Sequence, residues 1–323
     1  MSASTIVAGI GDLTVDTLLL GVEELPNWGR ETVISGVEKR LGGGLGNFAL
    51  AASALGMIVE PHGPVGSDEA GAWVMSEVQK LGVPAFHLET VAGGTTSQTF
   101  AVVRADGERM FLTIDGVLRR LDATMRHAQL GQANVVYVTG WCMPPRIDYS
   151  VCVARFEQWK DEGRMIAVDL SWSPESWTTS QNRARLVSLL RRADILFMNQ
   201  DELGALADIQ DVDLAASTVA ASLEHEPMIV IKLGSKGALV VSDGNACAVP
   251  TEPVDAADTV GAGDMFNAAM LYSLYGLGLA TTDSARFACG FSGLALLRGR
   301  SRLPSTAEVL DKLGHTGRVR ASV

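Results

Sequence analysis

The chain has 323 residues, a length that suits one large α/β domain or two smaller ones. Hydrophobic residues make up 47% and charged residues 20%, as in an ordinary soluble enzyme with a sizeable core. The formal net charge of −11 disfavours nucleic acid or an anionic membrane as the main partner, so an anionic ligand must be held by local donors.

The sequence shows no sign of secretion or of a disulfide framework. Four cysteines lie far apart without CxxC spacing, at positions 142, 152, 247 and 289. This pattern predicts reduced thiols and no zinc site. The N-terminal MSASTIVAGIGD lacks a basic region followed by a long apolar run, and no segment reaches about 18 uncharged apolar residues. We therefore expect a cytoplasmic protein with no membrane contact.

The first third of the chain mixes strands with helices. Apolar runs and alternation predict strands at residues 5–10, 14–20, 32–41, 97–104 and 109–114. The last two are expected to form a hairpin around Ala-Asp-Gly-Glu at 105–108. Helices are predicted after the glycine-rich segment 42–47 and at residues 69–81.

From about residue 121, helices and strands alternate regularly. Strands are predicted at residues 135–139, 165–170, 195–198, 228–233 and 238–242. Helices are predicted at 146–162, 181–192, 211–224, 263–277, 282–298 and 306–313. This alternation predicts a three-layer α/β/α core with a mostly parallel central sheet. The core would comprise residues 1–12, 41–93 and 116–323, and the remaining segments, 13–40 and 94–115, would form a small β lid over a pocket.

The segment from Asp258 to Asp264 reads Asp-Thr-Val-Gly-Ala-Gly-Asp and leads into an apolar helical run. The first amides of a helix have no internal acceptor and lie at the positive end of its dipole. Small residues at Gly261, Ala262 and Gly263 would let an anion approach those amides. A phosphoryl group and an acceptor alcohol beside Asp264 would suit this arrangement. A plain helix start, with Asp264 complementing the dipole, remains the alternative at this point.

Missing motifs narrow the possible functions. The chain has no GxxxxGK[ST] nucleotide loop, and no GxGxxG follows the first predicted strand. It also lacks a GxSxG elbow and an HExxH pair, and its five histidines are scattered. A dehydrogenase, a serine hydrolase and a zinc hydrolase are therefore disfavoured.

Three sets of residues, kept in order, resemble the ribokinase-like (PfkB) family of carbohydrate kinases. They are Gly42-Gly43 with Asn47, Asn199-Gln200-Asp201-Glu202, and the segment from Asp258 to Asp264. VGSDEAG at 65–71 and KLGSKG at 232–237 also fall at the expected places. The resemblance spans residues 5 to about 300 and implies the ribokinase-like fold and an ATP-dependent phosphotransferase.

The resemblance implies roles for residues near the phosphate. Asp264 would be the catalytic base, and the amides of Gly261, Ala262 and Gly263 would form an anion hole. Asn199 and Glu202 would organise Mg²⁺, largely through water. Their spacing also fits a helix cap, with Asn199 as cap and Glu202 completing a capping box, and this alternative stays open.

Other matched positions would bind the two substrates. Asp16, Thr14, Gly42, Gly43 and Asn47 are expected in the acceptor pocket. Thr14 stands where relatives often carry asparagine, which disfavours ribose and favours another polyol.

The nucleotide would lie near the turn of Gly234 and Gly237 and near Lys232. Lys232 replaces a frequent threonine and could instead be a solvated charge at the end of a strand. Trp141 is expected either to line the sugar pocket or to pack in the core.

The sequence thus predicts an ATP- and Mg²⁺-dependent kinase that phosphorylates a hydroxyl of a small sugar or sugar-like polyol. A nucleoside kinase and a non-catalytic sugar sensor on the same scaffold are the alternatives. Activation by a monovalent cation and a homodimer formed through the lid are left open. The identity of the acceptor, the hydroxyl phosphorylated and any phosphate already on the acceptor are not determined.

Overall fold

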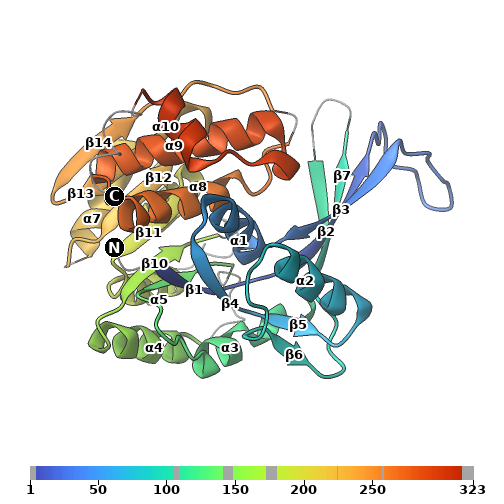
Figure 1. The fold of residues 1–323 in the computed structure, drawn as a ribbon, viewed down its shortest axis with the longest axis horizontal. Helices are drawn as coiled ribbons and strands as arrows, with labels where there is room; N and C mark the ends of the chain where they lie inside the picture. The colour runs from blue at the N-terminus through green and yellow to red at the C-terminus, as the bar shows by residue number, and fades with distance from the viewer. Residues whose placement is uncertain are drawn as a thin grey trace.

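The computed structural model describes residues 5–104, 109–140, 148–171, 180–223, 225–256 and 258–314. Within these residues, an eight-stranded sheet crosses the middle of the molecule (Figure 1), in the order β14-β13-β12-β11-β10-β9-β1-β4. Its strands are β1 (Ile6–Ile10), β4 (Ile58–His62), β9 (Val135–Val138), β10 (Met165–Asp169), β11 (Ile195–Asn199), β12 (Met228–Lys232), β13 (Ala238–Ser242) and β14 (Asn245–Val249). All neighbours from β4 to β12 pair in parallel, whereas β13 and β14 are antiparallel. The expected mostly parallel central sheet is confirmed.

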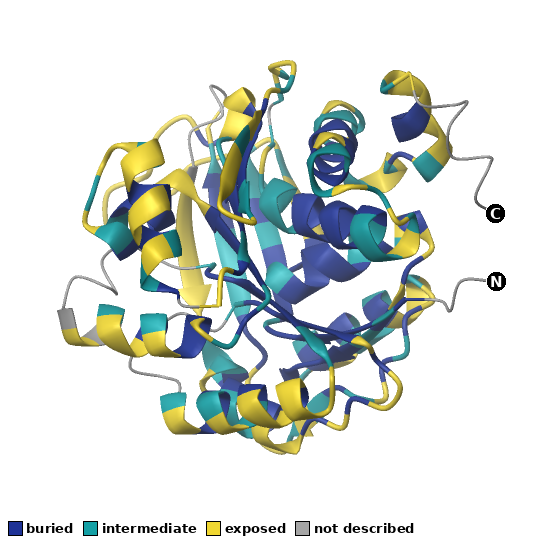
Figure 2. Cartoon of the chain, turned by 90° about the vertical axis from the view of Figure 1, so that its left-hand side faces the viewer, coloured by how far each residue is buried: buried dark blue, intermediate teal, exposed yellow. Residues whose placement is uncertain are grey.

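Helices cover both faces of this sheet. One face packs against α1 (Gly44–Leu55), α2 (Glu69–Lys80), α8 (Ala262–Leu271), α9 (Thr281–Arg298) and α10 (Thr306–Lys312). The other packs against α3 (Leu121–His127), α4 (Tyr149–Asp161), α5 (Ser180–Leu190), α6 (Gln200–Ala207) and α7 (Val212–Ser222). The central strands read as continuous apolar runs because both of their faces are buried, as Figure 2 shows. The three-layer α/β/α fold is confirmed.

Several boundaries differ from the sequence-based prediction, among them the start of α1 at Gly44, inside the glycine-rich segment after which this helix was expected. The strand expected at residues 32–41 begins at Gly36, because its partner β2 (Thr14–Leu20) ends where Leu20 pairs with Gly36. Helix α4 begins at Tyr149, where the side chain of Asp148 caps the Ser150 amide; residues 141–147 lie outside the described part. The helix expected at 263–277 is α8 up to Leu271, followed by a π-helical turn at Tyr272–Gly276.

A second sheet, which we call the small sheet, has four strands and stands at one side of the molecule (Figure 1). Its order is β3-β2-β7-β8, with β3 at Gly36–Gly42, β7 at Gln98–Val103 and β8 at Arg109–Ile114. Strands β7 and β8 pair antiparallel as predicted, and the turn expected between them at 105–108 lies outside the described residues. The short strands β5 (Pro64–Gly66) and β6 (Glu89–Val91) pair separately.

None of the helices in the described residues combines the length and the apolar character needed to cross a bilayer.

Candidate active site

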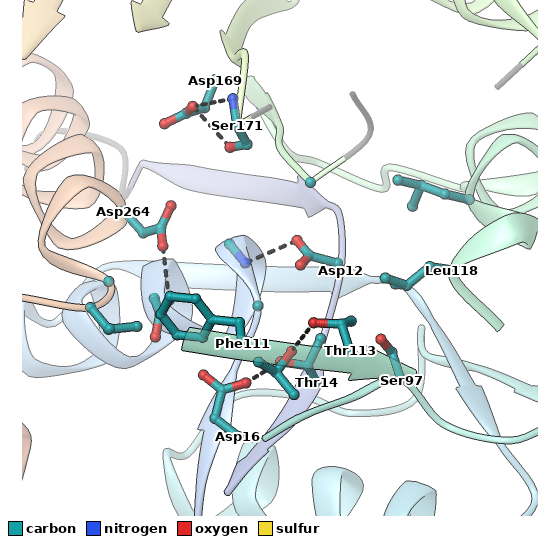
Figure 3. Close-up of a pocket in the computed structure, with 18 of the residues that line it drawn as sticks. Asp12, Thr14, Asp16, Ser97, Phe111, Thr113, Leu118, Asp169, Ser171 and Asp264 are labelled. Atoms are coloured by element: carbon teal, nitrogen blue, oxygen red, sulfur yellow. Dashed lines mark hydrogen bonds between the residues drawn. The ribbon is translucent and has the colours of Figure 1, made fainter. Parts of the chain in front are cut away.

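A cavity of about 440 Å³ opens at the carboxyl ends of the parallel strands (Figure 3). Asp12 follows β1, Asp169 ends β10, and Glu202 lies in the first turn of α6 after β11. Ligands of open α/β sheets bind at this edge, because successive strands deliver their following loops to the same place. We call this space the first cavity.

The start of α8 forms one wall of the first cavity. Gly261 is the N-cap with φ +79°, a conformation that side chains rarely adopt. A Cβ on Gly261 would also come within 2.7 Å of the Asn47 amide carbon. Asp264 is the third helical residue, as predicted. The Ala262 amide donates to the Thr259 carbonyl at 3.2 Å, so Gly263 and Asp264 are the first-turn residues whose amides lack an acceptor within the helix.

The carboxylate of Asp264 is held by neighbours from distant parts of the chain. The Asn47 amide nitrogen donates to Asp264 Oδ2 at 2.8 Å, and Asn47 Oδ1 accepts from the Arg300 guanidinium at 2.5 Å. Arg300 donates a second bond of 2.6 Å to the Leu41 carbonyl. Asn47 is 4% exposed. This chain of contacts fixes the direction in which the Asp264 carboxylate points.

The groups around Asp264 shift its pKa in opposite directions. Burial, and then the nearby Asp169 carboxylate, raise the pKa of Asp264 well above its ordinary value. The Lys232 ammonium and the hydrogen bond from Asn47 act in the opposite direction. Burial acts to lower the pKa of Lys232, but Asp169, Glu202 and Asp264 outweigh it and the net shift is upward. Lys232 therefore carries its charge at neutral pH.

Lys232 belongs to a buried polar network. Its Nζ lies 2.7 Å from Asp169 Oδ2, and the Asp169 side chain is only 2% exposed. The Asn267 amide, from α8, donates both to Asp169 and to the Tyr137 hydroxyl. The alternative of a solvated charge at the end of β12 is therefore wrong, because the Lys232 side chain is only 16% exposed.

The opposite wall of the first cavity comes from the small sheet. Thr14 and Asp16 of β2 lie on it, and the Thr14 hydroxyl donates to Asp16 Oδ1 at 2.8 Å. Burial raises the pKa of Asp16, whereas Thr14 and Arg40 act to lower it. Strands β7 and β8 add Ser97 at the start of β7 and, further along, Thr99, Phe111 and Thr113. Figure 3 shows Asp16, Thr14 and Thr113 below Asp12 and Asp264.

Asp12 is a further carboxylate in the first cavity. Its Oδ1 accepts from the Gly44 amide at 2.9 Å. Burial raises the pKa of Asp12 to about 6, although hydrogen bonds from backbone amides act to lower it. This carboxyl group therefore titrates near neutral pH.

A second cavity, of about 340 Å³, lies on the other side of the α8 start. Its lining includes Gly234 and Gly237 from the turn after β12, Ala262 and Gly263 from α8, and Thr251. Lys232 lines both cavities. The first turn of α8 and the Lys232 ammonium thus stand between two spaces, each large enough for a small ligand.

Asn199 and Glu202 form the capping box that the spacing allowed. The Glu202 amide donates to Asn199 Oδ1 at 2.8 Å, and the Asn199 amide donates to Glu202 Oε2 at 2.7 Å. Glu202 is 4% exposed and lines the first cavity. Asn199 lies at the end of β11 and, among the described residues, lines neither cavity.

The structure brings most of the predicted site residues together. The first cavity is lined by Asp264, Gly261, Asp16, Thr14, Gly43, Asn47, Glu202 and Lys232, and the second by Lys232, Gly234, Gly237, Ala262 and Gly263. Gly42 lies behind the first cavity, where a Cβ would meet the Asp16 carboxylate at 2.1 Å. Trp141 lies outside the described residues.

Several residues of the site were missed by sequence reasoning. Asp12 and Asp169 come directly at the ends of parallel strands, a position that could have been noticed. Arg40 pairs with Asp258 and thereby anchors the segment before α8. Arg40, Arg300 and Asn267 carry no local sequence signal, because their partners lie 98 to 259 positions away.

Curated proteins similar to this chain are sugar kinases. A "Probable fructokinase-3" of Arabidopsis thaliana is 27% identical over 86% of this chain and 84% of its own length. A "Ribokinase" of Haemophilus influenzae is 26% identical over 85% of this chain and 87% of its own.

Solved structures share the fold. An Arabidopsis thaliana ribokinase complexed with ribose and ATP superposes with a TM-score of 0.77 at 22% identity, covering 97% of this chain and 99% of that one. A Burkholderia thailandensis nucleoside kinase in complex with inosine gives a TM-score of 0.75 at 17% identity, covering 97% of each chain.

The family is settled by a match over most of the chain. The model of the pfkB family carbohydrate kinases matches residues 13–308. This range contains the α8 start and the residues from both sheets that surround it. The chain therefore belongs to the pfkB family of carbohydrate kinases, phosphotransferases that act on a sugar hydroxyl.

Proposed function

We propose that the protein transfers the γ-phosphate of ATP to a hydroxyl of a small sugar or sugar-like polyol bound in the first cavity. ATP would occupy the second cavity. The observation that carries this proposal is the position of Asp264 in the first turn of α8, between the two cavities. A carboxylate there can reach an alcohol on one side while the helix start faces a phosphate on the other.

In this proposal Asp264 accepts the proton of the attacking hydroxyl, and Asn47 directs the carboxylate toward it. The raised pKa of Asp264 makes it a stronger base once it is deprotonated. The free amides at the α8 start and the Lys232 ammonium would stabilise the negative charge on the transferring phosphoryl group. Asp16 would hold acceptor hydroxyls on the small-sheet side of the cavity.

The donor set also fits Mg²⁺, which prefers oxygen ligands and keeps several waters. Glu202 lines the first cavity and would supply a carboxylate oxygen. Asn199 would take part through water, since its Oδ1 already accepts an amide hydrogen. Bound Mg²⁺ would neutralise part of the charge of the ATP phosphates.

The assignment of the base is tested by Asp264→Asn with ATP and a panel of ketoses, aldoses and sugar acids. Asparagine keeps the shape and can still meet the Asn47 amide, but it is not a base. We expect turnover to fall by about 10²- to 10⁴-fold on the best substrate, with acceptor binding measured by calorimetry retained. Wild-type turnover in the variant would show that Asp264 is not the base.

A sugar is favoured over a nucleoside by the lining of the first cavity. Among its described lining residues, Phe111 is the one aromatic side chain, whereas a nucleobase is usually stacked against aromatic groups. Thermal-shift ranking of nucleosides against sugars would separate the two acceptors. Tight sugar binding without ADP release from any acceptor would instead support a sugar sensor.

We also propose that the segments 13–40 and 94–115 act as a lid and as a dimer contact. Five residues of the small sheet line the first cavity, so movement of this sheet would admit water to the cavity or exclude it. On strand β8, at the sheet edge, Met110, Leu112 and Ile114 are 42%, 61% and 44% exposed. An edge strand with exposed apolar side chains suits pairing with a second copy of the chain.

A further inference from the structure

Three side chains of types that can bind metal ions lie close together, and none of them lines either cavity. Glu60 and His62 lie two positions apart on β4, the edge strand of the large sheet, and therefore share one face. His87 comes from the connection between α2 and β6. One ligand atom from each of the three lies within 4.8 Å of the others, the one such group found among the described residues.

The polar atoms of this group lack partners. His62 is 3% exposed, and its Nε2 has no hydrogen-bond partner among the described residues. The buried Oε2 of Glu60 also has no hydrogen-bond partner among the described residues. Leaving such atoms without a partner costs free energy, so an unpartnered imidazole nitrogen and an unpartnered carboxylate oxygen in one cluster indicate a missing ligand.

We propose that Glu60, His62 and His87 bind a divalent transition-metal ion, with Zn²⁺ as the type example. Two imidazole nitrogens and one carboxylate oxygen are a donor set that Zn²⁺ accepts, with a fourth position left for water. The oxygen-only preference of Mg²⁺ makes it a poor occupant.

Binding of Zn²⁺ would draw together three donor atoms that lie within 4.8 Å of one another. Tetrahedral ligands of Zn²⁺ stand about 3.4 Å apart, given bond lengths of about 2.1 Å. Glu60 and His62 are held by the pairing of β4 with β1, whereas His87 lies in a loop. The rings of His62 and His87 are stacked with their centroids 4.5 Å apart, so the His87 side chain would have to rotate for both imidazoles to bind one ion. The positive charge of Arg155 acts on His62 and lowers its pKa. The Arg155 guanidinium donates hydrogen bonds to Gln158 Oε1 and to the Ala128 carbonyl.

Such an ion would link β4 to the connection between α2 and β6, which carries His87. The His62 carbonyl accepts from the Gly11 amide at 3.0 Å, and the Glu89 amide donates to the Gly63 carbonyl at 2.9 Å. A metal bridging β4 and His87 would therefore brace the end of β1 and the start of β6. Its role would be structural, separate from phosphoryl transfer.

The test uses the full-length, tag-free protein freed of metal with a chelator and titrated with ZnSO₄. We expect one Zn²⁺ per chain by calorimetry and by native mass spectrometry, and a higher Tm with zinc. His87→Ala, which leaves the buried strand intact, should weaken zinc binding at least tenfold and abolish the Tm increase. Glu60→Gln should weaken binding by a smaller factor.

The matched control is His127→Ala, since His127 is an exposed histidine on α3 and is not one of the three clustered side chains. It should bind zinc as the wild type does. X-ray absorption at the zinc edge should show two imidazole ligands in the wild type. Absence of binding by the wild type, equal binding by His87→Ala, or loss of binding in His127→Ala would each overturn the proposal.

Discussion

Lys232 lies among three carboxylates, and its charge opposes the rise in the pKa of the neighbouring Asp264. In the proposed reaction, Asp264 acts as a base only when deprotonated, so kcat/KM should rise with pH as this carboxyl group loses its proton. The residue that replaces a frequent threonine of the family would thus extend activity toward lower pH.

Replacing Lys232 by Met should move the acid limb of the kcat/KM profile upward by about one pH unit, because an opposite charge nearby lowers a carboxyl pKa by roughly 1–3 units. The variant also loses the ion pair with the buried Asp169, so folding is checked by circular dichroism before the profile is measured. Lys236→Met, at an exposed lysine of the next turn, should leave the limb in place. An unmoved limb in the Lys232 variant would refute this role.

The raised pKa of Asp12 affects the stability of the folded protein. Its pKa is about 6 in the folded protein and near 3.8 in the unfolded chain. Between these values the folded state binds a proton that the unfolded state releases, so the free energy of unfolding falls as pH rises through the window. Asp12→Asn stays neutral and can still accept from the Gly44 amide. It should be more stable than the wild type by about 1–3 kcal/mol at pH 7.

Urea unfolding at two pH values measures this difference. The advantage of Asp12→Asn should be present at pH 7, shrink as the pH falls, and disappear near pH 3, below the pKa of Asp12 in both the folded and the unfolded chain. A variant less stable than the wild type at pH 7 would contradict the sign. If Asp12 contacts the acceptor, the same variant should also raise the KM for sugar.

Among the elements, the turn before α8 is the most constrained. Gly261 combines a left-handed backbone with contact to Asn47, the residue that directs Asp264. Gly278 has a similar φ of +65°, but a Cβ there would meet nothing within 4 Å. The two glycines therefore separate backbone strain from displacement of a neighbour.

We expect Gly261→Ala and Gly278→Ala each to lose about 1–2 kcal/mol of stability from the left-handed conformation. Gly261→Ala should lose more than Gly278→Ala, because its Cβ also displaces the buried Asn47. Only Gly261→Ala should also lose kcat, by at least tenfold, because its Cβ pushes the Asn47 amide away from Asp264. Thermal unfolding and steady-state kinetics on both variants check this. Equal kcat values in the two variants would show that Asn47 does not position the base.

The sequence predicted what local pattern determines. Continuous apolar strands between amphipathic helices indicated the parallel sheet, and Gly-Ala-Gly-Asp indicated the helix start. Asn199 and Glu202 were ambiguous because one spacing serves both a capping box and a metal site. The buried ion pair of Lys232 could not be predicted from local sequence, since its partner Asp169 is 63 positions away. Ends of elements also depend on partners, as where β3 begins opposite the end of β2.

At the scale of the whole molecule, the exposed apolar edge of the small sheet makes oligomeric state testable. Leu112→Lys places a charge on β8 and should convert a dimer into a monomer in light scattering after size-exclusion chromatography. Leu214→Lys is the matched control, since Leu214 is 56% exposed on α7, against 61% for Leu112. A wild-type protein that is monomeric at high concentration would rule out the contact.

The wall that the small sheet gives to the first cavity has an evolutionary consequence. Thr99, Phe111 and Thr113 belong to a different sheet from the strands that lead to Asp12 and Asp169, and Ser97 directly precedes β7 of that sheet. Substitutions on β7 and β8 can therefore change which alcohol is accepted without disturbing the packing around α8. The specificity for the acceptor and the residues of phosphoryl transfer can therefore change independently in evolution. A descendant enzyme can come to use a new sugar while it keeps the residues around the start of α8.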